Sequence, residues 1–524
     1  MILALITIFI LIGATSCSSQ KTDFAMLAPV DTLIFIESKD IGQALGAVTG
    51  SSAFKESVES LPDFSSLNGM RIGVIVTGMD AEGDSIEGQD GEEIRIKPRF
   101  VVVAESSSWF WNPSKFLEGP IADFVSDSYG KEVKTSRIDD QDGAITEWKA
   151  ADGRKAFATS ADDLVFFSND LSALQLVLVT RRGERDNLSG NSALKRIRGD
   201  WMTAAGYISK EGVAQLSNLV GISTALTTTD DEDGRSFIAR IIPDLLRANV
   251  KEVLWTSKIA GDGIEDRYEI VLAAEVAEQM SVAMQTVTRE ANELLPMVPA
   301  SATSVTRYDL ASPSVAWGEL TYNLSESTDV LNANILARVL EGVFAPYGVA
   351  MADGLASSAI SPVFTVTLDE SGDQVVAVFN VRDTQLLRSV VAIDFLKAPE
   401  TFESFSFWKS DDDEFAYAQK GDLVVLGEFE SVKKALSSMQ TTDSFSKTAD
   451  FSRFKDTKGA AVTIGRDAES IEQLARALSL KSKTRKGTAN TYIVSTKFTT
   501  RGILRTTSSS TGLIGSLISQ FATK

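Results

Sequence analysis

Two kinds of apolar pattern alternate along the chain. Short runs of β-branched and other apolar residues, each of strand length, occupy residues 32–37, 71–77 and 100–104, and such runs predict buried strands. Residues 170–179 and 276–295 instead carry apolar side chains at helical spacing, which predicts two helices that each bury one face. The chain is therefore expected to mix strands and helices.

A break near residue 297 follows the second of these predicted helices. Pro296 and Pro299 lie within four residues of each other there. A proline removes a backbone donor and disfavours the helical conformation of the residue before it. We therefore place a domain boundary at this point.

The chain beyond this break resembles the chain before it. The triplet Asp163-Leu164-Val165 corresponds to Asp422-Leu423-Val424. Other pairs keep the same order with slowly changing offsets: Pro29 with Pro299, Leu194 with Phe451, Leu216 with Leu474, and Ser257 with Thr496. An internal repeat of this length indicates a duplicated domain. The predicted domains are residues 25–297 and 298–524.

The turns predict how the strands of each domain pair. Ala151-Asp152-Gly153 and Lys420-Gly421-Asp422 are short turn sequences between apolar runs, as in β-hairpins. We therefore predict an α+β fold of two duplicated domains, each a mostly antiparallel sheet with helices packed on one face. The first domain carries an acidic insertion at residues 227–234, expected to be a surface loop. Residues 512–521 have apolar positions at helical spacing and predict a helix that docks on the sheet.

The N-terminal segment has the features of a processing signal. Residues 2–12 are apolar apart from Thr7, small residues follow, and the only cysteine of the chain is Cys17. Eleven helical residues span about 16 Å, which is short of the roughly 30 Å hydrocarbon core of a bilayer. A signal peptide fits this length better than a transmembrane helix. The alternative is a buried N-terminal element with an incidental cysteine.

The small residues before Cys17 resemble the lipobox of bacterial lipoproteins. The resemblance implies cleavage of a signal peptide (residues 1–16), attachment of palmitate and other acyl chains to Cys17, and a lipidated tether (residues 17–24) that anchors the chain in the membrane. Ser18 stands where an aspartate would signal retention in the inner membrane, so the expected location is the outer membrane, on a face that the sequence does not specify, and periplasmic exposure is one of the two possibilities. Pro29-Val30-Asp31-Thr32 also resembles the opening of an uncharacterised family of exported bacterial proteins, which implies no activity.

Composition excludes several kinds of chemistry. The chain has 524 residues, no histidine, and 51 Lys and Arg against 71 Asp and Glu, for a net charge of −20. Without histidine there is no Ser-His-Asp triad, Cys-His pair, imidazole zinc site or histidine pH switch. The negative charge disfavours nucleic-acid partners. Because neither a dinucleotide-binding nor a P-loop motif occurs in a strand-to-helix setting, no nucleotide cofactor is expected.

Several polar motifs remain as candidate sites. The acidic clusters are residues 80–84, 139–143, 230–233 and 411–414. None has the spacing of a twelve-residue calcium loop, so we interpret them as solvated loops, with calcium binding as the alternative. Ser-x-x-Lys occurs at residues 52–55, 128–131 and 192–195, but the Ser-Asp-Asn and Lys-Thr-Gly segments of penicillin-binding enzymes are absent from the sequence. A carboxylate pair for glycoside hydrolysis cannot be chosen from 71 acidic residues.

Two further segments allow more than one interpretation. Trp109, Phe110, Trp111 and Phe116 form an aromatic cluster, which is interpreted as core packing, with contact to a glycan as the alternative. Residues 481–487 are basic and are interpreted as a solvated loop, with contact to anionic lipid heads as the alternative.

Together these patterns predict a non-catalytic envelope lipoprotein that acts as a binding or scaffold module for a protein, glycan or lipid partner. Cys17 is its predicted site of lipid attachment, and no catalytic, cofactor-binding or metal-binding residue is assigned. The first alternative is a histidine-free envelope hydrolase that uses carboxylates. The second is a periplasmic lipid carrier, which needs an apolar cavity of several hundred Å³ between sheet and helices.

Overall fold

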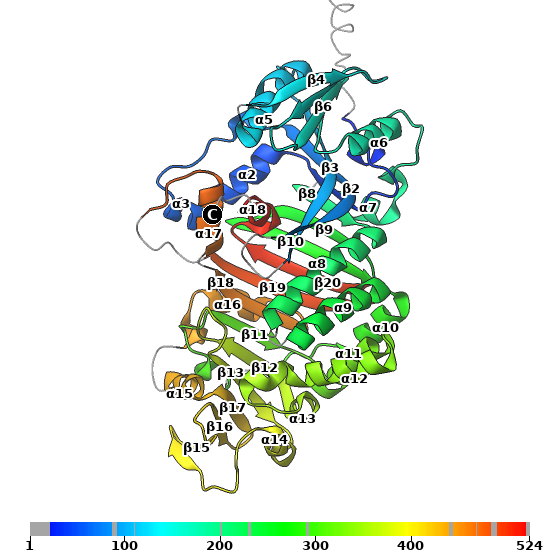
Figure 1. Cartoon of the computed structure of the whole chain (residues 1–524). Coiled ribbons are helices and arrows are strands. Elements are labelled where there is room, and N and C mark those ends of the chain that lie inside the picture. Colours follow the sequence, from blue (N-terminus) through cyan, green and yellow to red (C-terminus); the bar gives the residue numbers. More distant parts are fainter. Residues whose placement is uncertain are drawn as a thin grey trace, which may run out of the picture. The chain divides into compact units, whose positions relative to one another are not determined.

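The structure is a computed structural model of the chain (Figure 1). It describes residues 21–85, 92–108, 110–130, 132–199, 202–228, 232–289, 293–439, 444–467, 469–483 and 490–519. These residues form two compact units. Unit 1 comprises the described residues up to Phe35, Gly73–Val103 and Asn112–Lys195, and unit 2 comprises Ile36–Ile72, Ala104–Trp111 and everything from Arg196 onward.

Strands and helices alternate throughout the described chain. Up to residue 283 they are η1 (Phe24–Met26), β1 (Ile34–Ser38), α2 (Ile41–Gly50), α3 (Ser52–Ser57), η2 (Ser65–Leu67), β2 (Met70–Ser85), β3 (Glu92–Ser106), α4 (Pro113–Phe116), η3 (Leu117–Ile121), α5 (Ala122–Tyr129), β4 (Lys134–Ile138), β5 (Ile145–Lys149), β6 (Lys155–Ala161), β7 (Leu164–Ser168), α6 (Leu171–Arg181), η4 (Leu188–Gly190), α7 (Ser192–Ile197), β8 (Ala204–Ile208), α8 (Lys210–Thr228), α9 (Glu232–Asn249), β9 (Val250–Ala260), β10 (Gly263–Leu272) and α10 (Ala274–Ala283).

The later part of the chain belongs entirely to unit 2. Its elements are η5 (Leu295–Met297), β11 (Ser304–Tyr308), α11 (Pro313–Glu326), α12 (Val330–Glu341), η6 (Gly342–Tyr347), α13 (Ala352–Ser358), β12 (Ala359–Thr367), β13 (Val375–Val381), α14 (Thr384–Val390), β14 (Glu400–Phe402), β15 (Phe405–Lys409), β16 (Phe415–Lys420), β17 (Leu423–Glu428), α15 (Phe429–Ser438), η7 (Phe445–Lys447), α16 (Asp450–Asp456), β18 (Ala461–Asp467), α17 (Glu469–Ala477), β19 (Asn490–Thr499), β20 (Gly502–Ser509) and α18 (Gly512–Ser519).

An antiparallel sheet runs through unit 2. Its strand order is β14, β15, β16, β17, β13, β12, β11, β18, β19, β20, β10, β9, β8. The two halves of the sequence meet where β10 pairs with β20, with Ile264 opposite Ser509 and Val271 opposite Gly502. Strands and helices thus form an α+β fold with a mostly antiparallel sheet, as predicted.

Unit 1 repeats one end of this order. Its strands follow the order β4, β5, β6, β7, β3, β2, which matches β14, β15, β16, β17, β13, β12 of unit 2. Asp163 and Asp422, which the sequence comparison aligns, lie at the equivalent turns β6–β7 and β16–β17. Leu216 and Leu474 lie on the helices that follow β8 and β18. The duplication itself stays a prediction, and this correspondence supports it.

Helices cover both faces of the sheet around β13, where the sequence analysis expected them on one face. Val376 and Val378 face a core that includes Val432 of α15. Ala377 and Phe379, the alternate residues, face a second core that includes Leu387 of α14. The sequence of β13 explains this, since residues 375–379 are all apolar and such a run needs burial on both sides of the sheet.

Two other local expectations need correction. The helix predicted over residues 276–295 ends at Ala283, because the β-branched residues after it take extended backbone, and Thr286 bridges to Leu310. The insertion at residues 227–234 is not a simple loop, since α8 runs to Thr228 and α9 begins at Glu232. Residues 229–231 lie outside the described chain. The predicted C-terminal helix is α18, and the helix predicted over residues 170–179 is α6.

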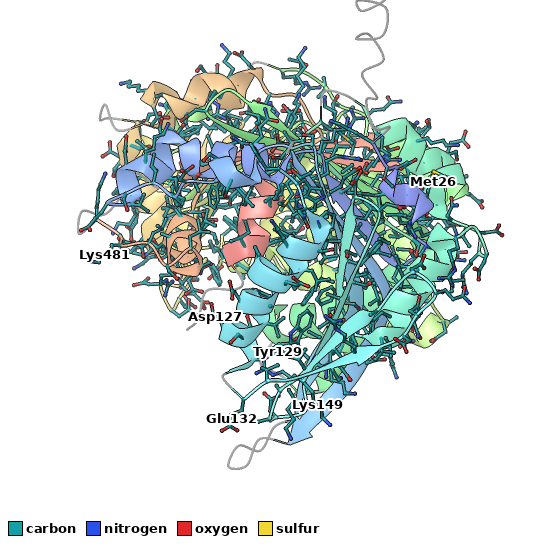
Figure 2. All side chains as sticks on the ribbon, turned by 90° about the horizontal axis from the view of Figure 1, so that it is seen from above. Met26, Asp127, Tyr129, Glu132, Lys149 and Lys481 are labelled. Carbon is teal, nitrogen blue, oxygen red and sulfur yellow. The ribbon has the colours of Figure 1, made fainter. Side chains whose placement is uncertain are left out.

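The β5–β6 hairpin of unit 1 shows how the predicted turns form. Gly153 takes a positive φ of 89° in this turn, a conformation that glycine adopts without steric cost. Beside the hairpin, the ring of Tyr129 lies 4.7 Å from the guanidinium of Arg154 (Figure 2). Its hydroxyl donates to the carbonyl of Lys155 at 3.4 Å. Helix α5 is thereby held against β6.

The N-terminal predictions fall mostly outside the described residues. Cys17, the predicted signal peptide and the first part of the predicted tether all lie there. Phe24, the last residue of the predicted tether, is fully buried in unit 1, so the folded chain has begun by that residue. Across the described residues, no helix combines the length and the apolar character needed to cross a membrane.

Candidate functional site

An apolar cavity of about 370 Å³ lies in unit 2 between the sheet and the helices that connect β11 to β12. One side of the cavity is formed by residues of β11, β12, β13, β18 and β19, and the other by α11, η6 and α13. Its lining residues are Met284, Tyr308, Leu310, Pro313, Ala316, Trp317, Leu320, Val343, Phe344, Tyr347, Leu355, Ala356, Ala359, Ser361, Val363, Thr365, Ala377, Ala460, Ala461, Thr496 and Phe498.

Small side chains on the sheet side of the cavity leave part of this space. Ala359, Ala377 and Ala461 line it from β12, β13 and β18, and a methyl group there leaves room that a leucine would fill. The pairing of β12 with β13 is also irregular between Ile360 and Phe364. Such irregularities commonly lie beside binding sites, because they redirect side chains.

The helical side of the cavity includes several large side chains. Pro313, Ala316, Trp317 and Leu320 of α11 follow the i, i+3, i+4, i+7 spacing of one helix face. The indole ring of Trp317 lies 5.7 Å from the ring of Phe344 on η6. Part of this face packs in a core with Met280 and Met284, and the same face also adjoins the cavity.

Five residues with hydroxyl groups line the cavity, among them Tyr308, Tyr347 and Thr365. Burial raises the pKa of both phenols, that of Tyr347 to about 12, while an interaction with the Thr365 hydroxyl opposes the rise in each case. Both phenols therefore stay protonated at every physiological pH.

None of the residues that line this cavity carries a charge. The wall also includes Ser361, whose hydroxyl is buried and has no hydrogen-bond partner among the described residues. An isolated charged group would be strongly disfavoured in such surroundings, because nothing there could compensate for its lost hydration.

Two other hollows of unit 2 have charged walls. One, of about 630 Å³, is lined by Arg289, Glu293, Lys420 and Asp422 among others. The other, of about 390 Å³, is lined by Arg289, Lys455 and other residues. Glu293 and Asp422 are exposed, whereas glycoside hydrolysis needs one carboxyl kept protonated at neutral pH by its surroundings. Asp309 lines the second hollow, where burial raises its pKa and Arg307, 2.8 Å away, opposes the rise. No second carboxylate lines that hollow among the described residues, so the hydrolase alternative gains no support here.

The buried carboxylates of unit 2 are engaged in structural contacts. Glu37 accepts from Arg198 at 2.7 Å, and Glu269 pairs with Arg501 at 2.7 Å. Asp266 accepts from the indole N–H of Trp255 at 2.9 Å and from the first turn of α18, at the backbone N–H of Leu513, at 2.7 Å. None of these three lines a cavity beside another carboxylate in the described part of the chain.

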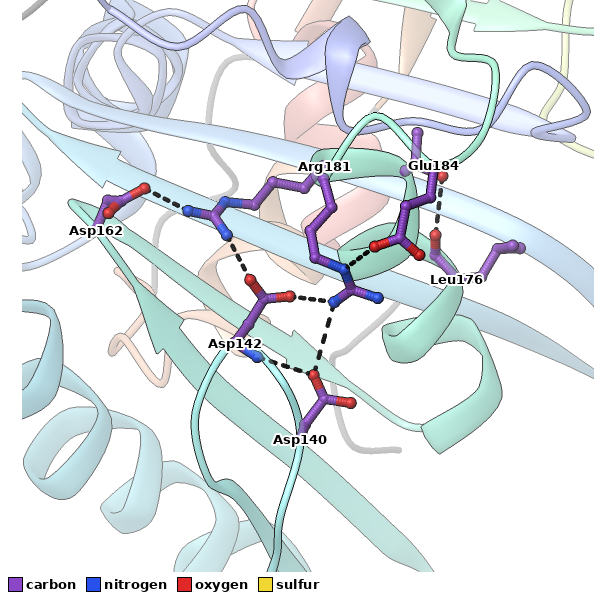
Figure 3. A network of polar contacts seen from close by, with 8 residues as sticks. Asp140, Asp142, Asp162, Leu176, Arg181 and Glu184 are labelled. Atoms are coloured by element: carbon purple, nitrogen blue, oxygen red, sulfur yellow. Dashed lines mark hydrogen bonds and ion pairs between the residues drawn. The ribbon is translucent and has the colours of Figure 1, made fainter.

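The acidic cluster at residues 139–143 is not the solvated loop that the sequence suggested. Asp142 accepts from Arg181 of α6 at 2.8 Å and also from Arg182 (Figure 3). Arg181 pairs with Asp162 as well, and Arg182 with Glu184. The two arginines lie at the C-terminal end of α6, where cations are favoured. This network fastens the β4–β5 turn to α6.

The remaining acidic clusters show no metal site. Asp411 pairs with Lys397, and Asp413 pairs with Lys409 at 2.7 Å. Hydrogen bonds from Ser410 and the backbone of Glu414 lower the pKa of Asp412. Asp80 pairs with Arg99 at 3.4 Å. In the cluster at residues 230–233, residues 230 and 231 lie outside the described chain, and the side chain of Asp233 is not among those described. Within the described ranges, no group of three or more Asp, Glu or Cys side chains is arranged to hold a metal ion.

The other sequence candidates are dispersed. Ser52 and Ser192 begin α3 and α7, and neither lines a described cavity; Lys131 lies outside the described residues. Phe110 is 91% exposed, so the core interpretation fails for it, while Trp109 lies outside the described residues. Residues 484–487 of the basic segment also lie outside the described residues.

Sequence reasoning missed the apolar cavity because its residues come from many separate elements. The i, i+3, i+4, i+7 pattern of α11 is visible in the sequence, but it predicts only a buried helix face. The alanines of β12, β13 and β18 become informative once the strand order places them together.

Comparisons with known proteins do not identify a relative. No family model matches the chain, and no curated protein matches it significantly. Among solved structures, the beta chain of DNA polymerase III from Streptococcus pneumoniae is paired with 91% of this chain and 99% of its own, at 10% sequence identity and a TM-score of 0.09. A TM-score this low carries no argument about fold or function.

Proposed function

We propose that this protein is a non-catalytic, lipid-anchored binding module of the bacterial envelope, and that unit 2 holds the hydrocarbon part of an apolar ligand. The apolar cavity beneath α11 carries this proposal. Among the partners considered from the sequence, a lipid is the one that such a cavity suits, because a protein or glycan partner would need an exposed surface instead.

The size and lining of the cavity support a small hydrocarbon ligand. Its volume of about 370 Å³ falls in the range of roughly 300–1,000 Å³ found for small-molecule sites. An apolar cavity of about 150 Å³ stays dry and binds benzene, so this one has room for a chain of about a dozen carbon atoms. Each CH₂ group that leaves water for the cavity contributes about 0.8 kcal/mol.

An anchor at Cys17 fits this activity. Acylation would keep the protein at a membrane surface, where apolar molecules are concentrated. The two features are argued independently, since the anchor rests on the sequence before residue 18 and the cavity on unit 2.

The first test looks for a ligand that purifies with the protein. The full chain is isolated from the bacterial envelope, extracted with organic solvent, and the released molecules are identified by mass spectrometry. The covalent acyl chains on Cys17 stay with the protein. Ala461→Leu and Ala356→Leu each place three additional carbon atoms in the cavity, one from the sheet and one from α13, and are expected to reduce the bound hydrocarbon at least fivefold.

Ala345→Leu is the matched control, because Ala345 is an exposed residue of η6 that does not line the cavity. It should leave the extracted ligand unchanged. Two results would contradict the proposed function. One is equal recovery of bound hydrocarbon from the wild type and all three variants. The other is that no apolar molecule is extracted from the wild type and that it does not bind added hydrocarbon.

A further inference from the structure

Hydroxyl groups lie on the wall of this apolar cavity. Tyr308, Tyr347 and Thr365 line it from β11, η6 and β12, and no hydrogen bond joins the two phenols among the described contacts. Each hydroxyl carries one O–H donor. A ligand in the cavity therefore meets neutral donors on a mostly apolar wall.

A donor in an apolar wall favours a ligand with an acceptor. Tyr308 is 36% exposed, whereas the hydroxyl of Ser361, on the wall of the same cavity, is buried and lacks a partner among the described residues. An unmade hydrogen bond in buried surroundings costs free energy, and a carbonyl oxygen placed there would satisfy the donor. The wall thus offers neutral donors together with an apolar surface.

A charged acceptor does not fit these surroundings. No lysine or arginine lines the cavity, so a carboxylate would lose its hydration without gaining a counter-ion. Tyr308 and Tyr347 are the only titratable residues of the wall, and neither can supply a positive charge. A free fatty acid would have to enter in its protonated form.

We propose that the ligand is a neutral acyl ester or amide with one hydrocarbon chain in the cavity and its carbonyl oxygen against the hydroxyls of Tyr308, Tyr347 and Thr365. This inference rests on the proposed function and narrows it to a chemical class. Neutral acyl esters and amides share the carbonyl acceptor, and both differ from fatty-acid anions in charge.

The test compares three probes with hydrocarbon chains of similar length: methyl decanoate, decanoate and undecane. Their dissociation constants for the full-length protein are measured by competition with a fluorescent apolar probe at pH 8. Tyr308→Phe and Tyr347→Phe remove single hydroxyls and keep the rings. Each variant should raise the dissociation constant of methyl decanoate three- to tenfold, as the loss of one neutral hydrogen bond predicts. The dissociation constant of undecane should stay unchanged.

Tyr322→Phe is the matched control, because Tyr322 lies on α11, is 52% exposed and does not line the cavity. It should change none of the three constants. Wild-type protein should bind decanoate at least tenfold more weakly than methyl decanoate at pH 8. The difference should narrow towards pH 5 as more of the acid becomes protonated.

Each contrary result has a distinct meaning. If decanoate binds as tightly as the ester at pH 8, or if both tyrosine variants bind the ester like the wild type, the neutral-carbonyl inference is wrong while the proposed function stands. If no probe binds at all, the proposed function fails with it. Unchanged undecane binding by the tyrosine variants shows that they are folded.

Discussion

Replacing Asp142 by asparagine should loosen the β4–β5 turn of unit 1. The Asp142 side chain is 11% exposed, and those of Arg181 and Arg182 are 19% and 21% exposed, so water screens these pairs less than typical surface pairs. The asparagine side chain would keep one acceptor oxygen but would turn an N–H group towards a guanidinium. Loss of one charge-assisted hydrogen bond costs about 1.5–3 kcal/mol.

Hydrogen exchange followed by mass spectrometry measures this cost locally, which suits a chain with two units that need not unfold together. A loss of about 2 kcal/mol corresponds to roughly thirtyfold faster exchange. The affected amides should be those of β4 and β5, while β18 (Ala461–Asp467) serves as an internal reference. The neighbouring variant Asp139→Asn is the control, because Asp139 is exposed, and it should alter exchange by about twofold at most. If the two variants exchange alike, the network does not hold the turn.

Two further predictions concern the anchor and α18. Cys17→Ser should abolish incorporation of labelled palmitate and leave an unprocessed or mislocalised precursor, and equal labelling of wild type and variant would refute the lipoprotein hypothesis. Burial raises the pKa of Asp266 above 3.8, so between that value and its native pKa the folded state binds more protons than the unfolded state. Stability measured by denaturant unfolding should therefore fall as the pH rises through this window. Asp266→Asn should reduce the pH dependence of the unfolding free energy in this window. If the variant keeps the wild-type slope, the pH dependence comes from other groups.

Local patterns predicted many elements correctly. The β-branched runs became β1, β2 and β3, and the helical spacing of residues 170–179 became α6, which Asp170 caps by accepting from the backbone N–H of Ala173 at 2.8 Å. These elements depend on residues close in sequence. The same reasoning failed for residues 284–289, because long-range pairing of Thr286 with Leu310 outweighs the apolar spacing that favoured a helix.

The candidate cavity could not be derived in this way. Its walls depend on which strands are neighbours and on which face each residue occupies, and neither follows from a single segment. The acidic cluster at Asp140 and Asp142 was misread for a related reason. The arginines that pair with these carboxylates come later in the sequence, and composition alone does not show that they lie within reach.

The pairing of β10 with β20 has a consequence for how the chain is made. Val271 and Gly502 are register partners, so one edge of β10 has no partner until a segment near the other end of the sequence has been synthesised. Contacts between such distant segments slow folding, and an open strand edge is a template for pairing with other chains. A chain interrupted after the β18–β19 region would therefore expose two edges, on β10 and β19. We expect incomplete chains to be prone to aggregation and to depend on chaperones or rapid proteolysis, even where the elements already made are correct.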